Sequence, residues 1–341
     1  MTVRVGINGF GRIGRNFLRA VVAADADIKI VAVNDLTDNA SLAHLLKYDS
    51  ILGRFPGTVE ASGDAIVVNG ESIGALEERD PASLPWKDLG ADVVLESTGL
   101  FTDATRARAH LEAGSRKVVI SAPAKNEDVT VVPGVNMDDY DPAAHDIVSN
   151  ASCTTNCLAP MAKVLNDGLG IERGLMTTIH AYTADQNLQD GPHRDLRRAR
   201  AAAINLIPTS TGAAKAIGIV MPDLQGKVDG MSMRAPVPTG SIVDLVCRVG
   251  QETTTDAVNE LFRSQADTGR FEGILQYSDE PLVSTDIQHS AYSSIFDSKL
   301  TMANGNLVKV FGWYDNEWGY SCRLVDLVAK VGATLPATVS A

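Results

Sequence analysis

Three glycines near the amino terminus constrain the fold of this chain more than any other feature of its sequence. Gly9-Phe-Gly-Arg-Ile-Gly14 directly follows an apolar run at residues 3–8 and opens a helical pattern over residues 12–24. In such a strand–turn–helix unit, Gly9 permits a tight turn, Gly11 lets the backbone approach a pyrophosphate, and Gly14 allows close packing of helix on strand. The helix start presents its N–H groups to the anion. The pattern therefore predicts a dinucleotide-binding βαβ unit.

An acidic residue farther along the chain supports this interpretation. Asp35 ends a second apolar run, residues 28–34, and follows Gly14 at about the 20-residue spacing of the dinucleotide-binding template. A carboxylate in this place binds the ribose hydroxyls and repels a 2′-phosphate, so we expect NAD rather than NADP as the cofactor. The alternative is a plain strand–turn–helix whose glycines serve packing alone.

Apolar runs alternate with helical patterns through the first 150 or so residues. Runs nearly continuous in Val and Ile are typical of parallel strands covered on both faces. Their alternation with helices predicts an α/β fold with a Rossmann-type doubly wound parallel sheet. After residue 153, strands and helices segregate, which predicts an α+β domain with a mixed sheet. Expected strands are residues 3–8, 28–34, 92–97, 117–121, 146–149, 175–182, 231–234, 242–249 and 307–313, with others around Leu275 and Leu282; expected helices are residues 12–24, 103–113, 154–166, 211–221 and 318–331.

Charge and cysteine content exclude several classes of protein. The net charge of −12 repels phosphate backbones and anionic lipids, so we expect neither a nucleic-acid nor a membrane partner. Four cysteines in 341 residues do not make a disulfide framework. The chain begins without the pattern of a secretory signal, and no apolar run approaches the ~20 residues that span a bilayer. These features predict a cytoplasmic protein.

A cysteine at a predicted helix start is the candidate nucleophile. Ser152-Cys-Thr-Thr-Asn-Cys157 follows a predicted strand and opens a predicted helix. The positive end of the helix dipole favours the thiolate form of Cys153. Cys157, one turn farther in, is expected to be a buried structural residue. Two thiols without a further Cys or His cluster do not supply a metal site, so no metal is expected.

A thiolate nucleophile usually needs a base within hydrogen-bond reach. His180 is the candidate, because it stands near the end of a predicted strand, where a loop begins. The alternatives are a small buried cysteine at a domain boundary and a structural histidine in a strand. We expect a dinucleotide-binding Rossmann domain over residues 1–152 and a catalytic domain over residues 153–317. A C-terminal helix over residues 318–332 is expected to pack back onto the first domain.

Five motifs of this chain occur together in one protein family. They are Asn8-Gly-Phe-Gly-Arg-Ile-Gly14, Ser152-Cys-Thr-Thr-Asn-Cys157, His180-Ala-Tyr-Thr183, Thr209-Ser-Thr-Gly-Ala-Ala-Lys215 and Trp313-Tyr-Asp-Asn-Glu-Trp-Gly-Tyr-Ser321. From about residue 3 to about residue 331, the chain resembles the phosphorylating glyceraldehyde-3-phosphate dehydrogenases. The resemblance implies oxidative phosphorylation of D-glyceraldehyde 3-phosphate to 1,3-bisphosphoglycerate, with NAD and inorganic phosphate, in glycolysis and gluconeogenesis. The reaction passes through a cysteine thiohemiacetal and a thioester.

The resemblance also implies a role for each matching residue. Cys153 is the nucleophile and His180 its activating base. Thr183 and Arg234 bind the substrate phosphate, with Arg198 facing the same region. The residues that bind the attacking phosphate are Ser152, Thr154, Thr211 and Gly212. The residues that contact the dinucleotide are Gly9, Gly11, Arg12, Ile13, Gly14, Asp35, Arg79, Ser121 and Asn316, the last of which holds the nicotinamide amide.

From the residues alone, three of these assignments have plain alternatives. Arg198 lies in a run of charges that is typical of a solvated face, Arg234 reads equally well as a surface strand residue, and Asn316 reads as a turn residue. Pro192 matches a proline of NAD-specific members. Thr239-Gly240 replaces the Asn-Val of many members, without loss of a role-bearing residue.

The family implies a homotetramer with its Arg-rich loop at an interface. Two other functions stay open. Erythrose-4-phosphate dehydrogenase has the same fold and nucleophile, although the full set of anion-binding residues favours the first activity. The other is a binding protein without turnover, with an RNA or surface-adhesion role; the negative charge and the intact nucleophile–base pair argue against it.

Overall fold

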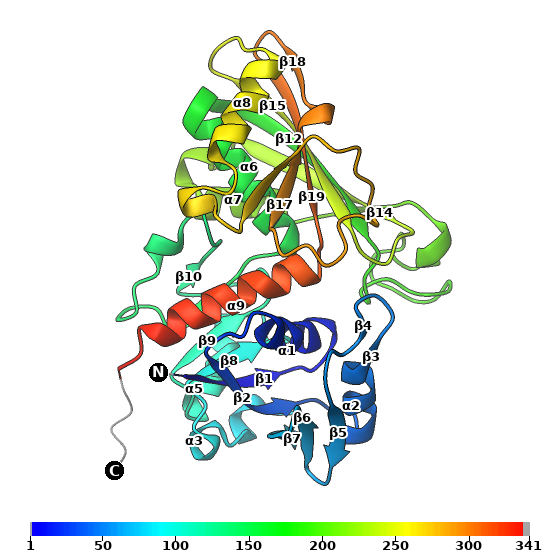
Figure 1. Ribbon diagram of the computed structural model, residues 1–341, viewed down its shortest axis with the longest axis vertical. Coiled ribbons are helices and arrows are strands. Elements are labelled where there is room, and N and C mark those ends of the chain that lie inside the picture. Colours follow the sequence, from blue (N-terminus) through cyan, green and yellow to red (C-terminus); the bar gives the residue numbers. More distant parts are fainter. Residues whose placement is uncertain (1, 337–341) are drawn as a thin grey trace. The chain divides into compact units, whose positions relative to one another are not determined.

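The computed structural model describes residues 2–336, which divide into two compact units (Figure 1). Unit 1 comprises Met1–Val131, Asp138–Ala151 and Ser321–Ala341, and unit 2 comprises Val132–Met137 and Ser152–Tyr320. The division falls inside α9 (Trp318–Ala333), so one helix supplies residues to both units.

Unit 1 is built on a nine-stranded sheet with the strand order β10-β11-β9-β8-β1-β2-β7-β6-β5. All pairings from β10 to β7 are parallel, whereas β6 pairs antiparallel with β5 and β7. The predicted doubly wound α/β fold is confirmed, with an antiparallel extension at one edge that the sequence pattern did not indicate. The strands are β1 Val3–Asn8, β2 Ile28–Asn34, β5 Val59–Ser62, β6 Ala65–Val68, β7 Glu71–Leu76, β8 Val93–Glu96, β9 Lys117–Ile120, β10 Val129–Thr130 and β11 Ile147–Ser149, and a separate pair joins β3 Tyr48–Asp49 to β4 Gly53–Arg54.

Two apolar clusters show why the central strands read as continuous apolar runs. One cluster gathers Ala32 of β2 and Val94 of β8 around Trp86, which is fully buried. The other joins Val118 and Ile120 of β9 to alanines of α4. Both clusters lie on one face of the sheet, because Ala32, Val94 and Val118 stand in one register row. The residues that alternate with them, Val93, Leu95 and Val119, are also fully buried, so both faces of these parallel strands are covered. The helices of this unit are α1 Arg12–Ala23, α2 Asn39–Lys47, α3 Trp86–Leu89, α4 Ala104–Ala107 and α5 Ala109–Glu112.

The glycine-rich turn between β1 and α1 has the geometry that its spacing predicts. Gly9 has a φ of +92°, in the region that favours glycine. A Cβ on Gly14 would lie 2.2 Å from the Gly9 carbonyl oxygen, so the helix can approach the turn only because this residue lacks a side chain. A Cβ on Gly11 would meet nothing within 4 Å, so this part of the backbone is open to a ligand.

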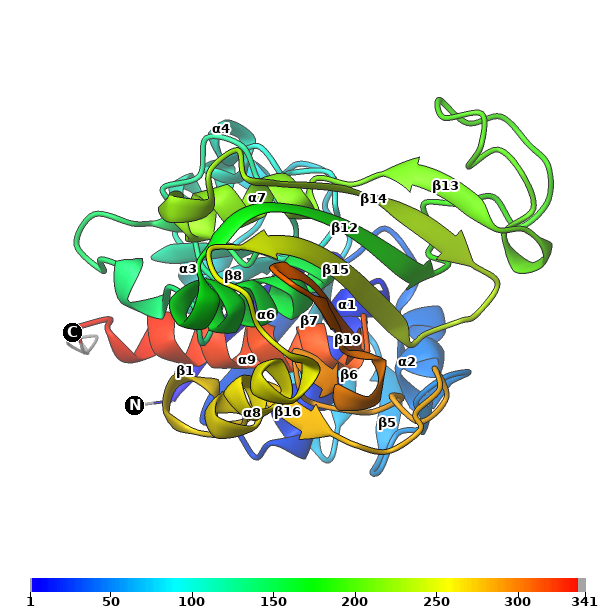
Figure 2. The same ribbon diagram turned by 90° about the horizontal axis from the view of Figure 1, so that it is seen from above.

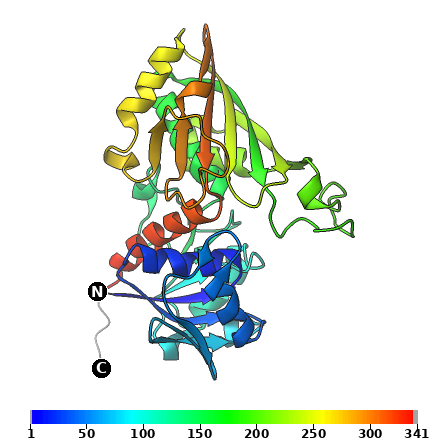
Figure 3. The ribbon, with the colours of Figure 1, turned by 45° about the vertical axis from the view of Figure 1, so that its right-hand side comes forward.

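Unit 2 contains an eight-stranded mixed sheet with the order β13-β14-β12-β15-β19-β17-β16, and β18 pairs with β19. Helices α6 and α8 cover one face of the sheet, and α7 packs along β14 (Figures 2 and 3). The predicted α+β domain with a mixed sheet is confirmed. The strands are β12 Ile171–Ala181, β13 Ile207–Ser210, β14 Val228–Ala235, β15 Ser241–Val249, β16 Leu275–Ser278, β17 Ser294–Asp297, β18 Met302–Asn304 and β19 Leu307–Tyr314, and the helices are α6 Cys153–Leu169, α7 Ala213–Val220 and α8 Thr255–Gln265.

Two predicted elements differ from the structure. The single helix expected over residues 103–113 is two short helices, α4 and α5, because the chain tightens at Arg108, whose carbonyl accepts from the Leu111 N–H three residues on. The strand expected around Leu282 is wrong. Leu282 follows Pro281, and its N–H closes a turn onto the Glu280 carbonyl instead of pairing with a strand. In the described part of the chain, no helix is long and apolar enough to cross a membrane.

Gly14 and Gly11 offer a matched pair for testing the turn. Gly14→Ala should lower the free energy of unfolding by about 1–3 kcal/mol, because its Cβ would collide with the backbone of Gly9. Gly11→Ala should leave it unchanged within about 0.5 kcal/mol, because the added methyl meets open space. Urea unfolding at one subunit concentration measures both. Equal losses in the two variants would contradict the close-packing role of Gly14.

Candidate active site

The thiol of Cys153 lies at the first residue of α6, as predicted. Ser152 caps this helix: its hydroxyl accepts from the Thr155 N–H at 3.0 Å and is within 2.8 Å of the Thr155 hydroxyl. This cap fixes the direction in which α6 leaves the strand before it. Cys153 Sγ is half-buried and lies 3.4 Å from His180 Nε2, so the predicted nucleophile and base are in contact. Cys157 is fully buried, in agreement with its predicted structural role.

The register of two neighbouring strands places the Arg234 guanidinium beside Cys153 and His180. In the parallel pairing of β12 with β14, His180 stands directly opposite Arg234. Arg234 Nη1 lies 2.8 Å from His180 Nδ1 and 3.1 Å from the Ala181 carbonyl oxygen. The same carbonyl is 2.7 Å from His180 Nδ1. The carbonyl can only accept, so we assign the imidazole proton to Nδ1, which donates to it and leaves Nε2 as the acceptor that faces the thiol. Arg234 Nη1 can only donate, so in this tautomer it bonds to the Ala181 carbonyl and makes no hydrogen bond to Nδ1.

Burial controls the protonation of this pair. Burial raises the pKa of the Cys153 thiol, and this effect outweighs the Arg234 charge and the hydrogen bonds of Thr154, which lower it. Burial, with the Arg234 charge as a second cause, lowers the pKa of His180 to about 3. The backbone hydrogen bonds at the helix start do lower the pKa of Cys153, as predicted, but burial outweighs them in the protein without ligands. A proton passed from Sγ to Nε2 adds no net charge to the pair.

Sequence reasoning missed Tyr314, the last residue of β19. Its buried hydroxyl lies 2.9 Å from the Thr154 hydroxyl and 2.7 Å from the Thr178 hydroxyl. Its ring meets the His180 ring edge-on, with the centroids 5.9 Å apart. Tyr314 thus connects α6, which carries the thiol, with β12, which carries the base. Tyr314 stands in the motif Trp313-Tyr-Asp-Asn-Glu-Trp-Gly-Tyr-Ser321, but just beyond the strand predicted over residues 307–313, and nothing in the motif assigned it a role.

The residues predicted to bind phosphate divide into two groups. Arg198 and Arg234 are close enough that the Arg234 charge, after burial, lowers the pKa of Arg198. Arg198 pairs with Asp185 and, at 3.3 Å, with Asp195. Two guanidinium groups that repel each other attract an anion between them.

The second group surrounds two helix starts. Gly212 caps α7, and the Thr211 hydroxyl accepts from the Ala213 N–H at 3.2 Å. The Thr154 hydroxyl points instead to Tyr314, so it is already engaged inside the protein. Thr183 is half-buried, and its N–H donates to the Gln186 side chain at 3.3 Å. The roles of these residues toward phosphate stay predictions.

Unit 1 holds a cavity of about 270 Å³ beside the glycine-rich turn. Asp35, one of its lining residues, accepts from the Phe10 N–H at 2.9 Å and from the Thr37 N–H at 3.1 Å, so its carboxylate is held against the turn. Among the other predicted residues, Arg79 is exposed on the cavity wall, Arg12 pairs with Asp49, and Ser121 donates to the Glu96 carbonyl at 3.1 Å. The cavity is lined by Asn8, Gly9, Gly11, Asn34, Asp35, Leu36, Glu78, Arg79, Ser97, Thr98, Leu100 and Phe101.

Asn316 is buried in unit 2 and held by two hydroxyls. Ser241 Oγ lies 2.9 Å from Asn316 Oδ1, and Thr239 Oγ1 lies 3.5 Å from it and 3.0 Å from Asp315 Oδ1. Gly240, between them, has a φ of +85°, and a Cβ there would lie 2.2 Å from the Ser284 carbonyl oxygen. Thr239-Gly240, the pair that replaces the Asn-Val of many family members, is therefore part of the loop that holds Asn316.

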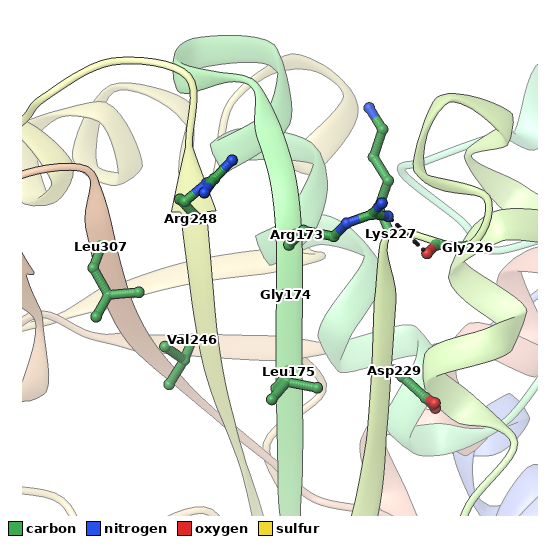
Figure 4. A pocket seen from close by; sticks show the side chains of 9 residues that line it. All are labelled: Arg173, Gly174, Leu175, Gly226, Lys227, Asp229, Val246, Arg248 and Leu307. Atoms are coloured by element: carbon green, nitrogen blue, oxygen red, sulfur yellow. Dashed lines mark hydrogen bonds between the residues drawn. The ribbon is translucent and has the colours of Figure 1, made fainter.

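A cavity of about 720 Å³ in unit 2 is lined by none of the predicted site residues (Figure 4). It lies over the outer face of β12, β14 and β15, with Leu175, Val246 and Leu307 on its floor and Arg173, Lys227 and Arg248 around it. No group of three or more His, Cys, Asp or Glu side chains that could hold a metal ion occurs within residues 2–336.

The Tyr314 hydroxyl has a measurable structural role. Tyr314→Phe should lower the free energy of unfolding by about 1–3 kcal/mol, because it leaves the buried hydroxyls of Thr154 and Thr178 without this partner. Tyr277→Phe is the control, since its hydroxyl bonds only to the exposed Arg263 at 2.8 Å, and it should change the value by less than about 0.5 kcal/mol. Guanidinium unfolding compares the two. A loss at Tyr314 no larger than that at Tyr277 would contradict the connecting role.

Comparisons with known proteins agree with this geometry. Residues 3–104 match the family description "Glyceraldehyde 3-phosphate dehydrogenase, NAD binding domain", and residues 152–316 match "Glyceraldehyde 3-phosphate dehydrogenase, C-terminal domain". Glyceraldehyde-3-phosphate dehydrogenase 1 of Streptomyces avermitilis is 62% identical, and glyceraldehyde-3-phosphate dehydrogenase of Mycobacterium avium is 64% identical. Each alignment covers 98% of this chain and the whole relative.

A third relative, glyceraldehyde-3-phosphate dehydrogenase 2 of Streptomyces arenae, is 59% identical over the same share of both chains. The names of these relatives do not favour the alternative activity, erythrose-4-phosphate dehydrogenase. The chain belongs to the glyceraldehyde-3-phosphate dehydrogenases, a family of NAD-dependent oxidoreductases.

Proposed function

We propose that this chain catalyses the NAD-dependent, phosphorylating oxidation of D-glyceraldehyde 3-phosphate to 1,3-bisphosphoglycerate, in glycolysis and gluconeogenesis. The observation that carries the proposal is the contact of Cys153 Sγ with His180 Nε2 at 3.4 Å, beside the Arg234 guanidinium. A nucleophile, a base and a cation for the substrate phosphate are the groups that this reaction needs from the protein. The names of the relatives point to the same substrate.

The proposed first step joins substrate and protein. Cys153 Sγ attacks the aldehyde carbon as its proton passes to His180 Nε2, and His180 then gives this proton to the substrate oxygen, which yields a hemithioacetal. This path suits a thiol whose pKa burial raises, because thiolate forms only as the bond forms. The Cys153 N–H at the start of α6 is available to the substrate oxygen. Thr183 and Arg234 hold the substrate phosphate, and Arg198 faces the same region.

The second half of the reaction returns the protein to its starting state. His180, once it has released the first proton, takes the hydroxyl proton of the hemithioacetal as hydride leaves the same carbon. The resulting thioester is attacked by inorganic phosphate at the helix starts near Ser152 and Gly212. The bond between the acyl carbon and Sγ breaks, the acyl phosphate leaves, and the proton held by His180 restores the thiol of Cys153. NAD supplies the hydride acceptor when bound.

The chain offers a fitting site for this cofactor. Gly11 leaves the turn open, the start of α1 presents N–H groups to a pyrophosphate, and Asp35 faces the cavity where ribose hydroxyls would bind. The proposed NAD-binding domain spans residues 1–152, with the C-terminal helix over about 318–332 packed onto it, and the proposed catalytic domain spans residues 153–317. The inclusion of Ser321–Ala341 in unit 1 supports this division, although unit 2 also takes in Val132–Met137. Asn316 is the proposed contact to the nicotinamide amide.

A cytoplasmic location and a homotetramer complete the proposal. Within the described residues no disulfide joins any of the four cysteines, as is usual in a reducing compartment. Large apolar side chains are exposed on the Arg-rich segment over residues 182–206, which projects beyond the ends of the strands in Figure 2. Exposed apolar groups gathered in this way are typical of an interface. They are Leu188, Leu196, Ile204 and Leu206, each at least 66% exposed.

The activity is tested by the absorbance of NADH formed from glyceraldehyde 3-phosphate and NAD, with and without inorganic phosphate. We expect sustained turnover that requires phosphate. Cys153→Ser should lower kcat by a factor of about 10³ or more while NAD binding stays within about twofold, because the turn of unit 1 is unaltered. Turnover with erythrose 4-phosphate alone would favour the related activity. Absence of NADH with either aldehyde would favour a binding protein without turnover.

The tetramer is tested by sedimentation velocity at micromolar concentration. We expect a species of four times the subunit mass of 36.2 kDa. Ile204→Glu, which adds a charge to the exposed apolar segment, should shift the protein to smaller species. Ile219→Glu is the control, since Ile219 is also exposed but lies on α7. A monomer for the unaltered chain would refute the proposal.

A further inference from the structure

A chain of buried polar side chains crosses the sheet of unit 1 beside the nucleotide cavity. It runs from Trp86 through His110 and Glu96 to Asn8 and Asn34, and each member is at most 4% exposed. His110 lies beyond residues 3–104, which match the NAD-binding family description, and nothing in the mechanism above uses it. Buried polar groups are costly unless every one is paired, so a set of five calls for an explanation.

The hydrogen bonds of this chain fix the proton on His110. Trp86 Nε1 can only donate, and it lies 3.0 Å from His110 Nδ1, so Nδ1 accepts. In the neutral ring the proton is then on Nε2, which donates to Glu96 Oε2 at 3.1 Å. The indole itself is locked in place, because its ring fills the space where a Cβ on Gly6 would lie only 2.5 Å away.

Glu96 receives hydrogen bonds at both carboxylate oxygens. Oε2 accepts from Asn8 Nδ2 at 2.6 Å as well as from His110. Oε1 accepts from the Thr98 N–H at 2.8 Å and from the Thr98 hydroxyl. Every partner is a donor, so the carboxylate acts only as an acceptor. The position of this one group is therefore set from four directions.

Both ends of the chain reach the wall of the nucleotide cavity. On one side, Thr98 Oγ1 accepts from the Leu100 N–H at 3.0 Å, and Thr98 and Leu100 line the cavity. On the other side, Asn8 Oδ1 accepts from Asn34 Nδ2 at 2.7 Å. Asn34 then clamps Glu78 by two bonds, Glu78 N–H to Oδ1 at 2.7 Å and Nδ2 to the Glu78 carbonyl at 2.8 Å.

We propose that His110, with Glu96, is a positioning residue for NAD binding: it sets the carboxylate that holds the two opposite walls of the cavity, at Thr98 and, through Asn8 and Asn34, at Glu78. His110 does not line the cavity, so it acts through these neighbours and not by contact with the cofactor. The inference rests on the proposed assignment of this cavity to NAD. It predicts a defect in NAD affinity that leaves the catalytic groups of unit 2 unaltered.

The test measures NAD binding to the full chain by titration calorimetry, with steady-state kinetics alongside. His110→Leu removes the donor to Glu96, and we expect NAD to bind about tenfold more weakly, the usual effect of an unpaired buried polar group. The KM for glyceraldehyde 3-phosphate and for phosphate, and kcat at saturating NAD, should stay within about twofold. His110→Gln can place an amide N–H near Glu96 and should restore most of the affinity, which a purely structural role would not require.

Three further variants keep the result interpretable. Ile147→Val, a fully buried change in the same unit, should lower the melting temperature without weakening NAD binding. Glu96→Gln keeps the shape but sets an amide group against donors, so it should also weaken binding, and it replaces His110→Leu if that variant does not fold. Asp35→Ala is the reference, because it alters a residue that lines the cavity and should reduce the preference for NAD over NADP.

The outcomes separate the two hypotheses. Normal NAD affinity in folded His110→Leu and Glu96→Gln, with an altered NAD preference in Asp35→Ala, would overturn the positioning role and leave the cavity assignment intact. Normal affinity and preference in all three variants would overturn both. Weak binding in His110→Leu that His110→Gln does not improve would reduce His110 to a structural core residue.

Discussion

The candidate active site depends on the parallel pairing of β12 with β14. That register places His180 opposite Arg234, and the cation then faces both the imidazole and the thiol at the start of α6. A slip of one residue would turn either side chain to the other face of the sheet, because side chains alternate along a strand. The antiparallel pairing of β14 with β13 holds Arg234 from its other side, opposite Ile207. The chemistry is therefore built into the sheet, with no loop needed to bring base and cation together.

The same sheet explains how a buried site can stay polar. Tyr314 offers one hydroxyl to Thr154 and Thr178, so three polar groups from α6, β12 and β19 satisfy one another out of reach of water. In unit 1, Glu96 does the same for donors from several elements. The Tyr314 hydroxyl and the Glu96 carboxylate take no part in the proposed reaction, but each fixes the position of the polar groups around it. Breaking such a set leaves unpaired atoms behind, which costs more than an apolar cavity of the same size.

Predictions from the sequence were most accurate for elements in which a single physical requirement determines which residues can occur. The bounds of β1 and β2 follow from continuous burial of parallel strands, and the glycine-rich turn follows from close approach at Gly14. The break at Arg108 and the turn at Leu282 were missed, because each depends on local backbone bonds that leave no periodic signal. The contact of Cys153 with His180 was predicted correctly, because each residue lies in a motif of the family. The protonation of the thiol was not predicted, because burial raises the pKa of Cys153 by more than the helix start lowers it.

The opposite shifts of the two pKa values constrain how the pair can act. Burial penalises a lone thiolate and a lone imidazolium alike, so neither group stores a charge while it waits for substrate. Arg234 favours the thiolate but opposes the imidazolium, so by itself it does not drive the proton from Sγ to Nε2. An anion on Arg234 would weaken both effects together, and under the proposed function the substrate carries one in its phosphate group. The cation would then position the substrate instead of setting the direction of proton transfer, and the proton would leave Sγ only as the new bond to carbon removes the negative charge.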